Sequence, residues 1–343
     1  MSNISSSTHD PALNVPRIFI PPGAENDWRL LTPLNIQVRR LWPWAFSIQK
    51  IISASEPHPR KTGRLFIASD YGGEHPRATH HIYCYLVVRG GGRQCITALQ
   101  RARERLLPDR RRMSYKRLDD GHRRHALIPY LQAAADLDGH LVAIAVDKRK
   151  KWLSTTEGTA ADLCQAFGLR AKWSARGLEL LMRKVHFNAI MLSIWSQPYC
   201  DLTWITDQDE FVANDRRHDD ALLAGARMSS FYVPHPMGVF RLNTTGQDSE
   251  ATDYEDVCAI PDLAAGMLSE IATRVAADMP LEDGVLFAME SGMPTKAEII
   301  ADWFWDDRMS LRKTLISIDV RGSQYAVRKV HMANQYGGSP AQE

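Results

Sequence analysis

The sequence lacks any run of about 18 consecutive apolar residues, the least that a membrane-spanning helix requires. Its polar beginning contains no basic stretch followed by an apolar one, which a secretion signal would need. Cysteine is scarce, and the five cysteines include no Cys-x-x-Cys pair, which argues against both structural zinc and a disulfide framework. We therefore expect a cytoplasmic protein with no membrane contact and with reduced, buried thiols.

An excess of one charge sign is also missing, because 42 lysines and arginines face 40 aspartates and glutamates, for a net charge of +2. Basic residues nevertheless gather between Arg101 and Arg124, where ten of them are opposed by four acidic residues. This segment predicts either a surface that binds nucleic-acid phosphates or an ordinary solvated helix face and loop. The candidate phosphate-binding residues are Arg110, Arg111, Arg112, Lys116 and Arg117.

The chain divides into four stretches with different patterns. Residues 1–16 are polar and predicted to be disordered, and residues 17–60 contain apolar runs broken by prolines, which predicts a lead-in that packs on the main body. Strand-like and helix-like patterns alternate over residues 61–278, which we predict to form one domain. Residues 279–343 are predicted to form an appendage that covers the site or makes a homodimer contact.

The apolar pattern of the predicted domain changes repeatedly between period two and the helical period. Proline in a first turn is typical of a helix start, so the last helix of the domain is predicted to begin at Pro261. The order of elements predicts an α/β fold with a mixed sheet flanked by helices. We predict strands over residues 64–70, 80–88, 140–147, 201–207 and 238–242, and helices over residues 96–107, 123–137, 177–195, 219–228 and 261–275.

The predicted appendage has a clear local pattern of its own. Residues 296–305 are amphipathic and aromatic, which predicts a helix. Residues 311–320 and 324–331 alternate with period two on either side of a glycine-containing turn, which predicts a β-hairpin.

Three aspartates stand at the ends of predicted elements. Asp70 ends the first core strand, Asp207 ends a later strand, and Asp262 opens the last helix of the domain. Neighbouring strand ends lie about 5 Å apart, so these carboxylates can converge on one small volume. Like charges at short range raise one another's pKa, whereas Mg²⁺ or Mn²⁺ takes oxygen ligands and can be shared with substrate phosphates. The pattern therefore predicts a divalent-metal site with Mg²⁺ or Mn²⁺ as the cofactor.

Each aspartate also has a purely structural explanation. Asp70 can form the turn that follows its strand. Asp262 can favour the macrodipole at a helix start, and Asp207 can belong to a solvated loop. The order of the three along the chain is what favours a shared site.

Several segments carry a resemblance to a known family. RLFIASDYGGEHPRATHHIYCYLVV is similar to an opening in which an Asp-Glu-Ser-Gly motif ends a first strand and a second apolar strand follows. MSYKRLDDGHRRHALIPYLQ and HLVAIAVDK are similar to a middle part in which a lysine precedes a helix and a strand ends in Asp-Lys. LTWITDQDE is similar to a strand with an acidic end, and AIPDLAAGMLSEI to a Leu-Ala-Asp-x-x-Ala-Gly helix start. Between residues 64 and 275 the chain thus resembles the bacterial family called domain of unknown function 3800.

This resemblance implies an RNase H-like fold and metal-dependent phosphodiester cleavage. Carried over by position, it implies that Asp70, Asp207 and Asp262 are the catalytic metal ligands. Asp209 would help Asp207 or substitute for it, and Lys116 would neutralise a phosphate.

The sequence departs from the family pattern around two of its motifs. Tyr71 and Gly72 replace the glutamate and serine of the first motif, and Ser114 stands where an acidic residue often precedes the lysine. Asp119 or Asp120 could supply the missing carboxylate.

These patterns leave two functions open. The first is a Mg²⁺- or Mn²⁺-dependent nuclease, a hydrolase acting on the phosphodiester bonds of RNA or DNA. The alternative is a non-catalytic RNase H-like module that binds nucleic acid or a protein, and the departures from the family motifs favour it.

Overall fold

A computed structural model gives the structure of the chain and describes residues 18–19, 42–55, 59–107, 109, 111–156, 159–247, 253–278, 285–286 and 295–332. The predicted disorder of residues 1–16 lies outside this described part. The chain forms two structural units, each described by itself below. The first unit comprises Met1–Ala68, Val87–Arg93 and Trp152–Ser249, and the second comprises Ser69–Leu86, Gln94–Lys151 and Glu250–Glu343.

Strands β2 (Thr62–Gly72) and β3 (His80–Arg89) pass from one unit to the other. In the first unit, β2 is followed across the sheet by β5 (Ser196–Thr206), β6 (Met237–Thr244) and β1 (Ile18–Phe19). Strand β6 runs parallel to β5 and antiparallel to β1. This sheet is therefore mixed, as the sequence predicts.

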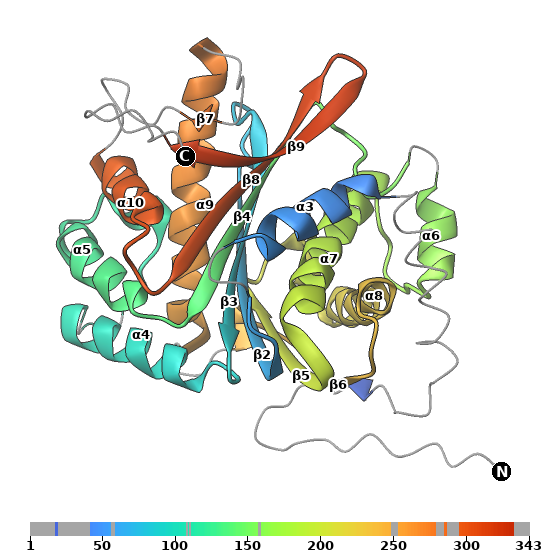
Figure 1. Cartoon of the computed structure of the whole chain (residues 1–343), viewed down its shortest axis with the longest axis horizontal. Coiled ribbons are helices and arrows are strands. Elements are labelled where there is room, and N and C mark those ends of the chain that lie inside the picture. Colours follow the sequence, from blue (N-terminus) through green and yellow to red (C-terminus); the bar gives the residue numbers. More distant parts are fainter. Residues whose placement is uncertain are drawn as a thin grey trace. The chain divides into compact units, whose positions relative to one another are not determined.

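The longest helix of the first unit is α7 (Ala175–Trp195), and most of its side chains are buried. It packs against α8 (Asp215–Tyr232) and α3 (Pro43–Ser53) (Figure 1). Trp44 of α3 lies edge-on to His186 and Phe187 of α7. Its indole N–H donates to the carbonyl of Leu153 at 3.1 Å. The lead-in segment thus contributes a helix to this unit. A short α6 (Ala160–Ala166), η2 (Glu210–Val212) and η3 (Thr245–Gln247) complete it.

The sheet of the second unit continues from the end of β2 through β3, β4 (Gly139–Asp147), β8 (Arg312–Arg321), β9 (Gln324–Met332) and β7 (Val285–Leu286). Strand β8 pairs in parallel with β4 over seven residues and antiparallel with β9. The predicted hairpin is confirmed, but it extends the sheet of this unit instead of forming an appendage. The physical reason is that six consecutive side chains of β8, residues 314–319, are buried, as in a central strand covered on both faces.

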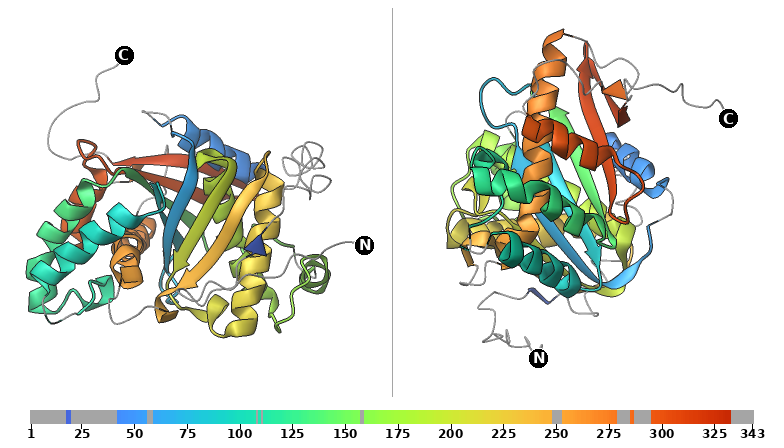
Figure 2. Two further views of the ribbon diagram at one scale, coloured as in Figure 1. Left: turned by 90° about the horizontal axis from the view of Figure 1, so that it is seen from below. Right: turned by 90° about the vertical axis from the view of Figure 1, so that its left-hand side faces the viewer.

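Four helices lie on one face of these strands: α4 (Arg93–Leu106), α5 (Gly121–Ala135), α9 (Asp253–Asp278) and α10 (Thr295–Trp305) (Figures 1 and 2). The short η1 (Tyr115–Arg117) lies between α4 and α5 in the chain and contacts α9. Helix α9 thus contacts both η1 and α10 on this face.

Helix α9 begins at Asp253, so the prediction that a helix starts at Pro261 is wrong. The local proline signal is overridden by packing, because residues 256–260 are buried. The Arg103 Nε lies 2.8 Å from the Asp256 carboxylate, and the Tyr130 hydroxyl donates to the Asp256 carbonyl at 2.7 Å. That second bond anchors the turn before Pro261, whose missing N–H weakens the helix ladder there.

The remaining predicted elements are confirmed, most of them within three residues at each end. Strand β5 begins five residues earlier than predicted, and α8 is four residues longer at each end. All five cysteines lie in the described part of the chain as free thiols, and four of them are buried as expected, whereas Cys164 is partly exposed. Among the described residues, no helix combines the length and the hydrophobicity that crossing a bilayer demands.

We expect Asp256→Ala to lower the free energy of unfolding by about 3–5 kcal/mol, because it leaves the buried Arg103 guanidinium without its carboxylate partner. Denaturant titration measures the change. Glu255→Ala is the matched control, since Glu255 pairs with the more exposed Arg112 and its loss should cost about 1 kcal/mol or less. Equal losses in the two variants would contradict this assignment.

Candidate functional site

Small residues on α9 let two other segments of the second unit approach its backbone. A Cβ atom added to Gly72 at the end of β2 would lie 2.8 Å from the carbonyl oxygen of Ala265. A Cβ atom added to Gly266 would lie 2.2 Å from the ring of Tyr115 in η1. Real side-chain atoms do not approach this closely, so glycine is required at both positions. The end of β2 and the η1 turn are thereby brought onto the same part of α9.

Asp70 lies near the end of β2 and is half-buried. Its Oδ1 accepts a hydrogen bond from the backbone N–H of the next residue, Tyr71, at 2.5 Å. Tyr71 packs edge-on against Tyr83 and Tyr85, and its hydroxyl lies 2.8 Å from that of Ser69.

Asp262 is half-buried on α9, three turns from the start of that helix instead of at its opening. Its Oδ2 accepts the backbone N–H of Tyr115 at 2.7 Å. A hydrogen bond of this kind favours the ionised carboxylate. Asp262 therefore holds the first residue of η1 against α9.

The thiol of Cys84 in β3 interacts electrostatically with both carboxylates. Burial raises the pKa of its thiol well above the usual value, and the negative charges of Asp70 and Asp262 raise it further. The two carboxylates, predicted from distant parts of the sequence, thus share the surroundings of one buried side chain in the second unit.

Tyr115 is the centre of a second set of contacts around η1. Its hydroxyl donates to the carboxylate of Glu270, and burial, followed by this bond, raises the pKa of Tyr115. The ammonium group of Lys296 lies 4.8 Å from the centre of the Tyr115 ring and 3.3 Å from Asp119. Helices α9 and α10 therefore hold Tyr115 from both sides.

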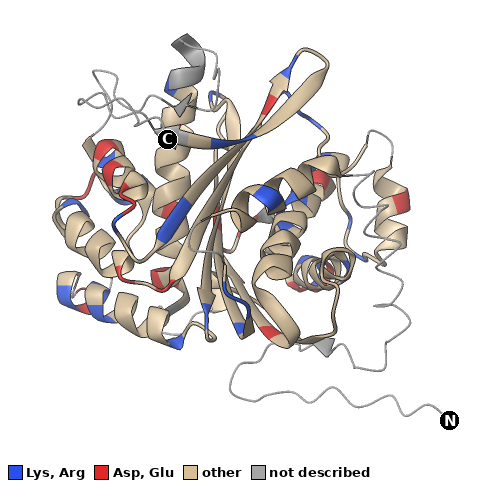
Figure 3. Cartoon of the chain, viewed as in Figure 1, with Lys and Arg blue, Asp and Glu red and all other residues tan. Residues whose placement is uncertain are grey.

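The basic segment is partly neutralised and partly exposed. Arg111 pairs with Asp109 and Asp120, and Arg112 pairs with Glu255 of α9. Lys116 and Arg117 of η1 are exposed, next to the Tyr115 N–H that binds Asp262. Arg110 lies outside the described residues. Helix α4 also carries basic residues (Figure 3), of which Arg101 and Arg105 are exposed.

The two suggested substitutes for a fourth carboxylate have other partners. Asp120 caps α5 through the N–H of His122 at 2.9 Å and also accepts hydrogen bonds from Arg111 and Arg123. Asp119 is exposed and pairs with Lys296. Both residues therefore have structural roles at the edges of η1.

Asp207 and Asp209 belong to the first unit. Asp207 follows the end of β5, and its Oδ1 accepts the hydroxyl of Thr245 at 2.5 Å. Asp209 accepts the N–H of Phe211 at 2.9 Å with one oxygen and pairs with the buried Lys184 at 2.5 Å with the other. Asp209 thus caps η2 and compensates a buried charge.

Of the predicted site residues, the second unit brings together Asp70, Asp262 and the turn that carries Lys116. Within the described part of the chain, no group of three or more His, Cys, Asp or Glu side chains is arranged to hold a metal ion. The second unit thus contains two of the three predicted ligands, Asp70 and Asp262, and both contribute to the raised pKa of Cys84. The convergence of Asp207 with them stays a prediction.

Comparisons with known proteins give no match. No protein-family model matches the chain, and neither a curated protein nor a solved structure matches it.

The sequence does not single out Tyr115 or Glu270. Gly266 stands in the segment AIPDLAAGMLSEI, and its position gives one signal of its own. Glycine in a helix interior costs about 1 kcal/mol, so its presence in the run Leu263-Ala264-Ala265-Gly266 indicates a close approach by another segment. The sequence contains no comparable signal for the identity of that segment.

We expect Gly266→Ala to destabilise the second unit by about 1–3 kcal/mol, because the new Cβ atom would overlap the Tyr115 ring. Gly121→Ala is the matched control, since nothing lies within 4 Å of a Cβ atom at that position of α5. The free energy of unfolding of each variant checks this. A stability of Gly266→Ala equal to that of the control would show that α9 and η1 are not in close contact.

Proposed function

We propose that the chain is a metal-dependent nuclease in which Asp70 and Asp262 hold Mg²⁺ or Mn²⁺. The observation that carries the proposal is the close approach of the end of β2, which carries Asp70, to the part of α9 that carries Asp262, since Gly72 lies against the carbonyl of Ala265. The raised pKa of the buried Cys84 thiol, to which both carboxylates contribute, agrees with this placement. A divalent cation would favour the ionised form of two carboxylates in the same surroundings. The RNase H-like fold implied by the family resemblance is part of the proposal, and the mixed sheets of both units are compatible with it.

The donor groups fit a hard divalent cation better than a soft one. Carboxylate oxygens suit Mg²⁺ and Mn²⁺, whereas a thiolate would favour zinc. Burial and the two carboxylates raise the pKa of Cys84, so its thiol keeps its proton and is a poor ligand. When bound, such an ion activates a water molecule and stabilises the leaving oxygen of a phosphodiester.

The side chains of η1 would bind the substrate. Asp262 accepts the Tyr115 N–H at 2.7 Å, and Lys116 and Arg117 follow directly and are exposed. A carboxylate that holds both a cation and this turn keeps the two basic groups at a fixed place relative to the reacting phosphate. We assign to Lys116 and Arg117 the neutralisation of substrate phosphates, with Arg101 and Arg105 of α4 as additional contacts.

Asp207, which the family pattern implies as a further ligand, belongs to the first unit, and this role stays a prediction. We assign Asp209 to positioning η2 and not to binding metal, because its two oxygens already accept hydrogen bonds from the Phe211 N–H and the Lys184 ammonium group.

A non-catalytic module that binds nucleic acid is the second candidate. The observation in its favour is that the described residues contain no group of three or more metal-ligating side chains. In that case Asp262 would serve only to hold η1, and the exposed basic residues would be the functional ones.

The metal proposal predicts that Mn²⁺ raises the melting temperature of the wild-type protein, because an ion at 100 times its Kd stabilises the folded state by about 2.7 kcal/mol. Asp70→Asn and Asp262→Asn should lose this rise and any Mg²⁺- or Mn²⁺-dependent cleavage of labelled RNA or DNA. Asparagine at 262 still offers an oxygen to the Tyr115 N–H, so its metal-free stability should change little.

Asp136→Asn is the control for this experiment, because Asp136 is an exposed aspartate after α5. It should keep both the metal-induced rise and the cleavage. Full cleavage by Asp70→Asn would refute the nuclease proposal. Binding of nucleic acid without any effect of metal would instead support the non-catalytic module.

The role of η1 predicts a change in the salt dependence of nucleic-acid binding. Replacing both Lys116 and Arg117 by alanine should reduce the slope of log K against log[salt] by about 1.8 for a duplex, since each lost phosphate contact removes about 0.9. Lys172→Ala, at an exposed lysine of the first unit, should leave the slope unchanged. Fluorescence anisotropy over a salt series measures it, and an unaltered slope in the double variant would exclude η1 from the interface.

A further inference from the structure

Four exposed basic residues of the first unit lie around the start of β2 and are called the basic cluster below: Arg60, Lys61, Arg64 and Arg93. The first two precede the strand, Arg64 is its third residue, and Arg93 begins α4. The backbone N–H of Gly90 donates to the Arg64 carbonyl at 2.9 Å, which joins the segment after β3 to the start of β2. The cluster is therefore built from two segments that are hydrogen-bonded to each other.

A turn of three glycines, residues 90–92, brings the start of α4 back beside β2. Their φ angles are 80° to 83°, a conformation that other residues rarely adopt. A Cβ atom added to Gly91 would lie 3.8 Å from Cδ of Arg64, and one added to Gly92 would lie 2.4 Å from the ring of Phe66. The turn thus packs closely on β2 and keeps Arg93 in the neighbourhood of Arg64.

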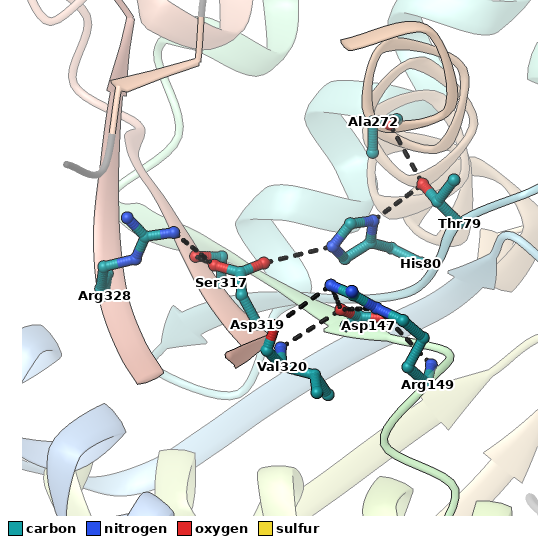
Figure 4. A network of polar contacts seen from close by, with 9 residues as sticks. All are labelled: Thr79, His80, Asp147, Arg149, Ala272, Ser317, Asp319, Val320 and Arg328. Atoms are coloured by element: carbon teal, nitrogen blue, oxygen red, sulfur yellow. Dashed lines mark hydrogen bonds and ion pairs between the residues drawn. The ribbon is translucent and has the colours of Figure 1, made fainter. Parts of the chain in front are cut away.

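The charges of the basic cluster are not compensated by ion pairs with any described residue. The segments that carry it, residues 59–68 and 87–93, contain no aspartate or glutamate. In the second unit, by contrast, Arg149 binds the carboxylate of Asp147 and Arg328 binds that of Asp319 (Figure 4). The positive charge of the cluster is therefore balanced by ions from solution, which a bound polyanion would release.

An exposed aromatic side chain lies on the neighbouring strand, β5. The side chain of Gln197 on β5 would lie 2.9 Å from a Cβ atom added to Gly63 on β2. The thiol of Cys200 makes a hydrogen bond to the Leu65 backbone. Tyr199 lies between these two contacts, so it is on the same level of the sheet as the start of β2. Its side chain is 58% exposed.

The backbone of Tyr199 is fixed in an unusual conformation. Its φ is 61°, and among the described residues no other residue except glycine has a positive φ. Its N–H donates to the Pro236 carbonyl at 2.8 Å, and its own carbonyl oxygen would lie 2.8 Å from a Cβ atom added to Gly238. Such conformations are costly and cluster at binding sites. The segment before β6 thus holds Tyr199 in a defined place.

A fixed, exposed ring beside uncompensated arginines fits single-stranded nucleic acid. Arginine binds phosphates, and unpaired bases stack on aromatic rings. Inside a duplex the base faces are covered by neighbouring base pairs, so Tyr199 can stack only on an unpaired base. An anionic lipid surface would also attract the charges. However, Tyr199 is the one large exposed hydrophobic side chain among the described residues of this unit, which is little for insertion into a membrane.

We propose that the basic cluster and Tyr199 form a surface of the first unit that binds single-stranded nucleic acid. The basic cluster binds phosphates of one strand, and the Tyr199 ring stacks on a base of that strand. The inference rests on the proposed function for the kind of partner, because it assigns an unpaired segment of the nuclease substrate to this unit. None of its residues belongs to the proposed metal site.

Fluorescence anisotropy of labelled oligo(dT) and oligo(U), titrated with the full-length protein in EDTA, tests this surface. Tyr199→Ala should weaken binding about tenfold, the effect of losing one base–aromatic stack, whereas Tyr199→Phe keeps the ring and the wild-type affinity. Replacing both Arg64 and Arg93 by alanine should reduce the slope of log K against log[salt] by about 1.4, since each lost phosphate contact to a single strand removes about 0.7.

Two controls match these variants. Ile128→Ala removes a hydrophobic side chain that is 50% exposed, and the pair Lys172→Ala and Arg176→Ala removes two exposed charges of the first unit. Both should bind the oligonucleotides as the wild type does. Tyr199→Gly relieves the positive φ, so it should weaken binding without lowering the free energy of unfolding, which separates stacking from a folding defect.

Unchanged oligonucleotide binding in Tyr199→Ala and in the double arginine variant would overturn the inference. An equal loss of affinity for a blunt duplex in Tyr199→Ala would also contradict it, because no unpaired base is then involved. Binding of phosphatidylserine vesicles that depends on the cluster, with oligonucleotide binding unaffected, would assign the surface to lipid instead.

The same measurements separate this inference from the nuclease proposal, because no metal is present. Single-strand binding through the cluster, without Mn²⁺-dependent cleavage, would support this surface and refute the nuclease. Cleavage by a protein whose binding ignores these substitutions would support the nuclease and refute this surface.

Discussion

The close approach of two segments to α9 at Ala265 and Gly266 is the constraint on which the second unit depends. Gly72 lies against the carbonyl of Ala265, and the Tyr115 ring lies against Gly266. Any side chain at either glycine would separate these segments from the helix. The small residues therefore allow Asp70 and Asp262, almost two hundred positions apart in the chain, to raise the pKa of the same buried thiol, that of Cys84.

This packing gives Asp262 a structural role beside the proposed metal-binding one. The carboxylate holds η1 through the Tyr115 N–H, and the same bond favours its ionised form. A charged group fixed in this way is oriented before a cation or a substrate arrives, which reduces the entropy lost on binding. A structural contact at a predicted ligand is thus compatible with the metal proposal. Such contacts orient ligating carboxylates in metal sites generally.

The sequence predicted the elements whose signals are local. The strands that contain Asp70 and Cys84 follow from apolar runs that end at glycines, and the C-terminal hairpin follows from a period-two pattern around a turn. The α/β class follows from the order of the elements. The start of α9 was predicted wrongly, because Pro261 is a strong local signal and the packing of Asp256 with Arg103 is not visible in the sequence. The same holds for the pairing of β8 with β4, which depends on burial of both faces of the strand.

Within the site, the sequence identified the acidic residues but not what arranges them. The bond from Tyr115 to Asp262 joins positions 147 apart, and the Tyr115–Glu270 bond joins positions 155 apart. No local pattern encodes such contacts. Anomalous diffraction from a crystal grown with Mn²⁺ tests the central claim most directly. The account predicts a manganese peak about 2.0–2.3 Å from carboxylate oxygens of both Asp70 and Asp262. A peak bound elsewhere, or two ordered carboxylates with no metal at saturating Mn²⁺, would contradict it.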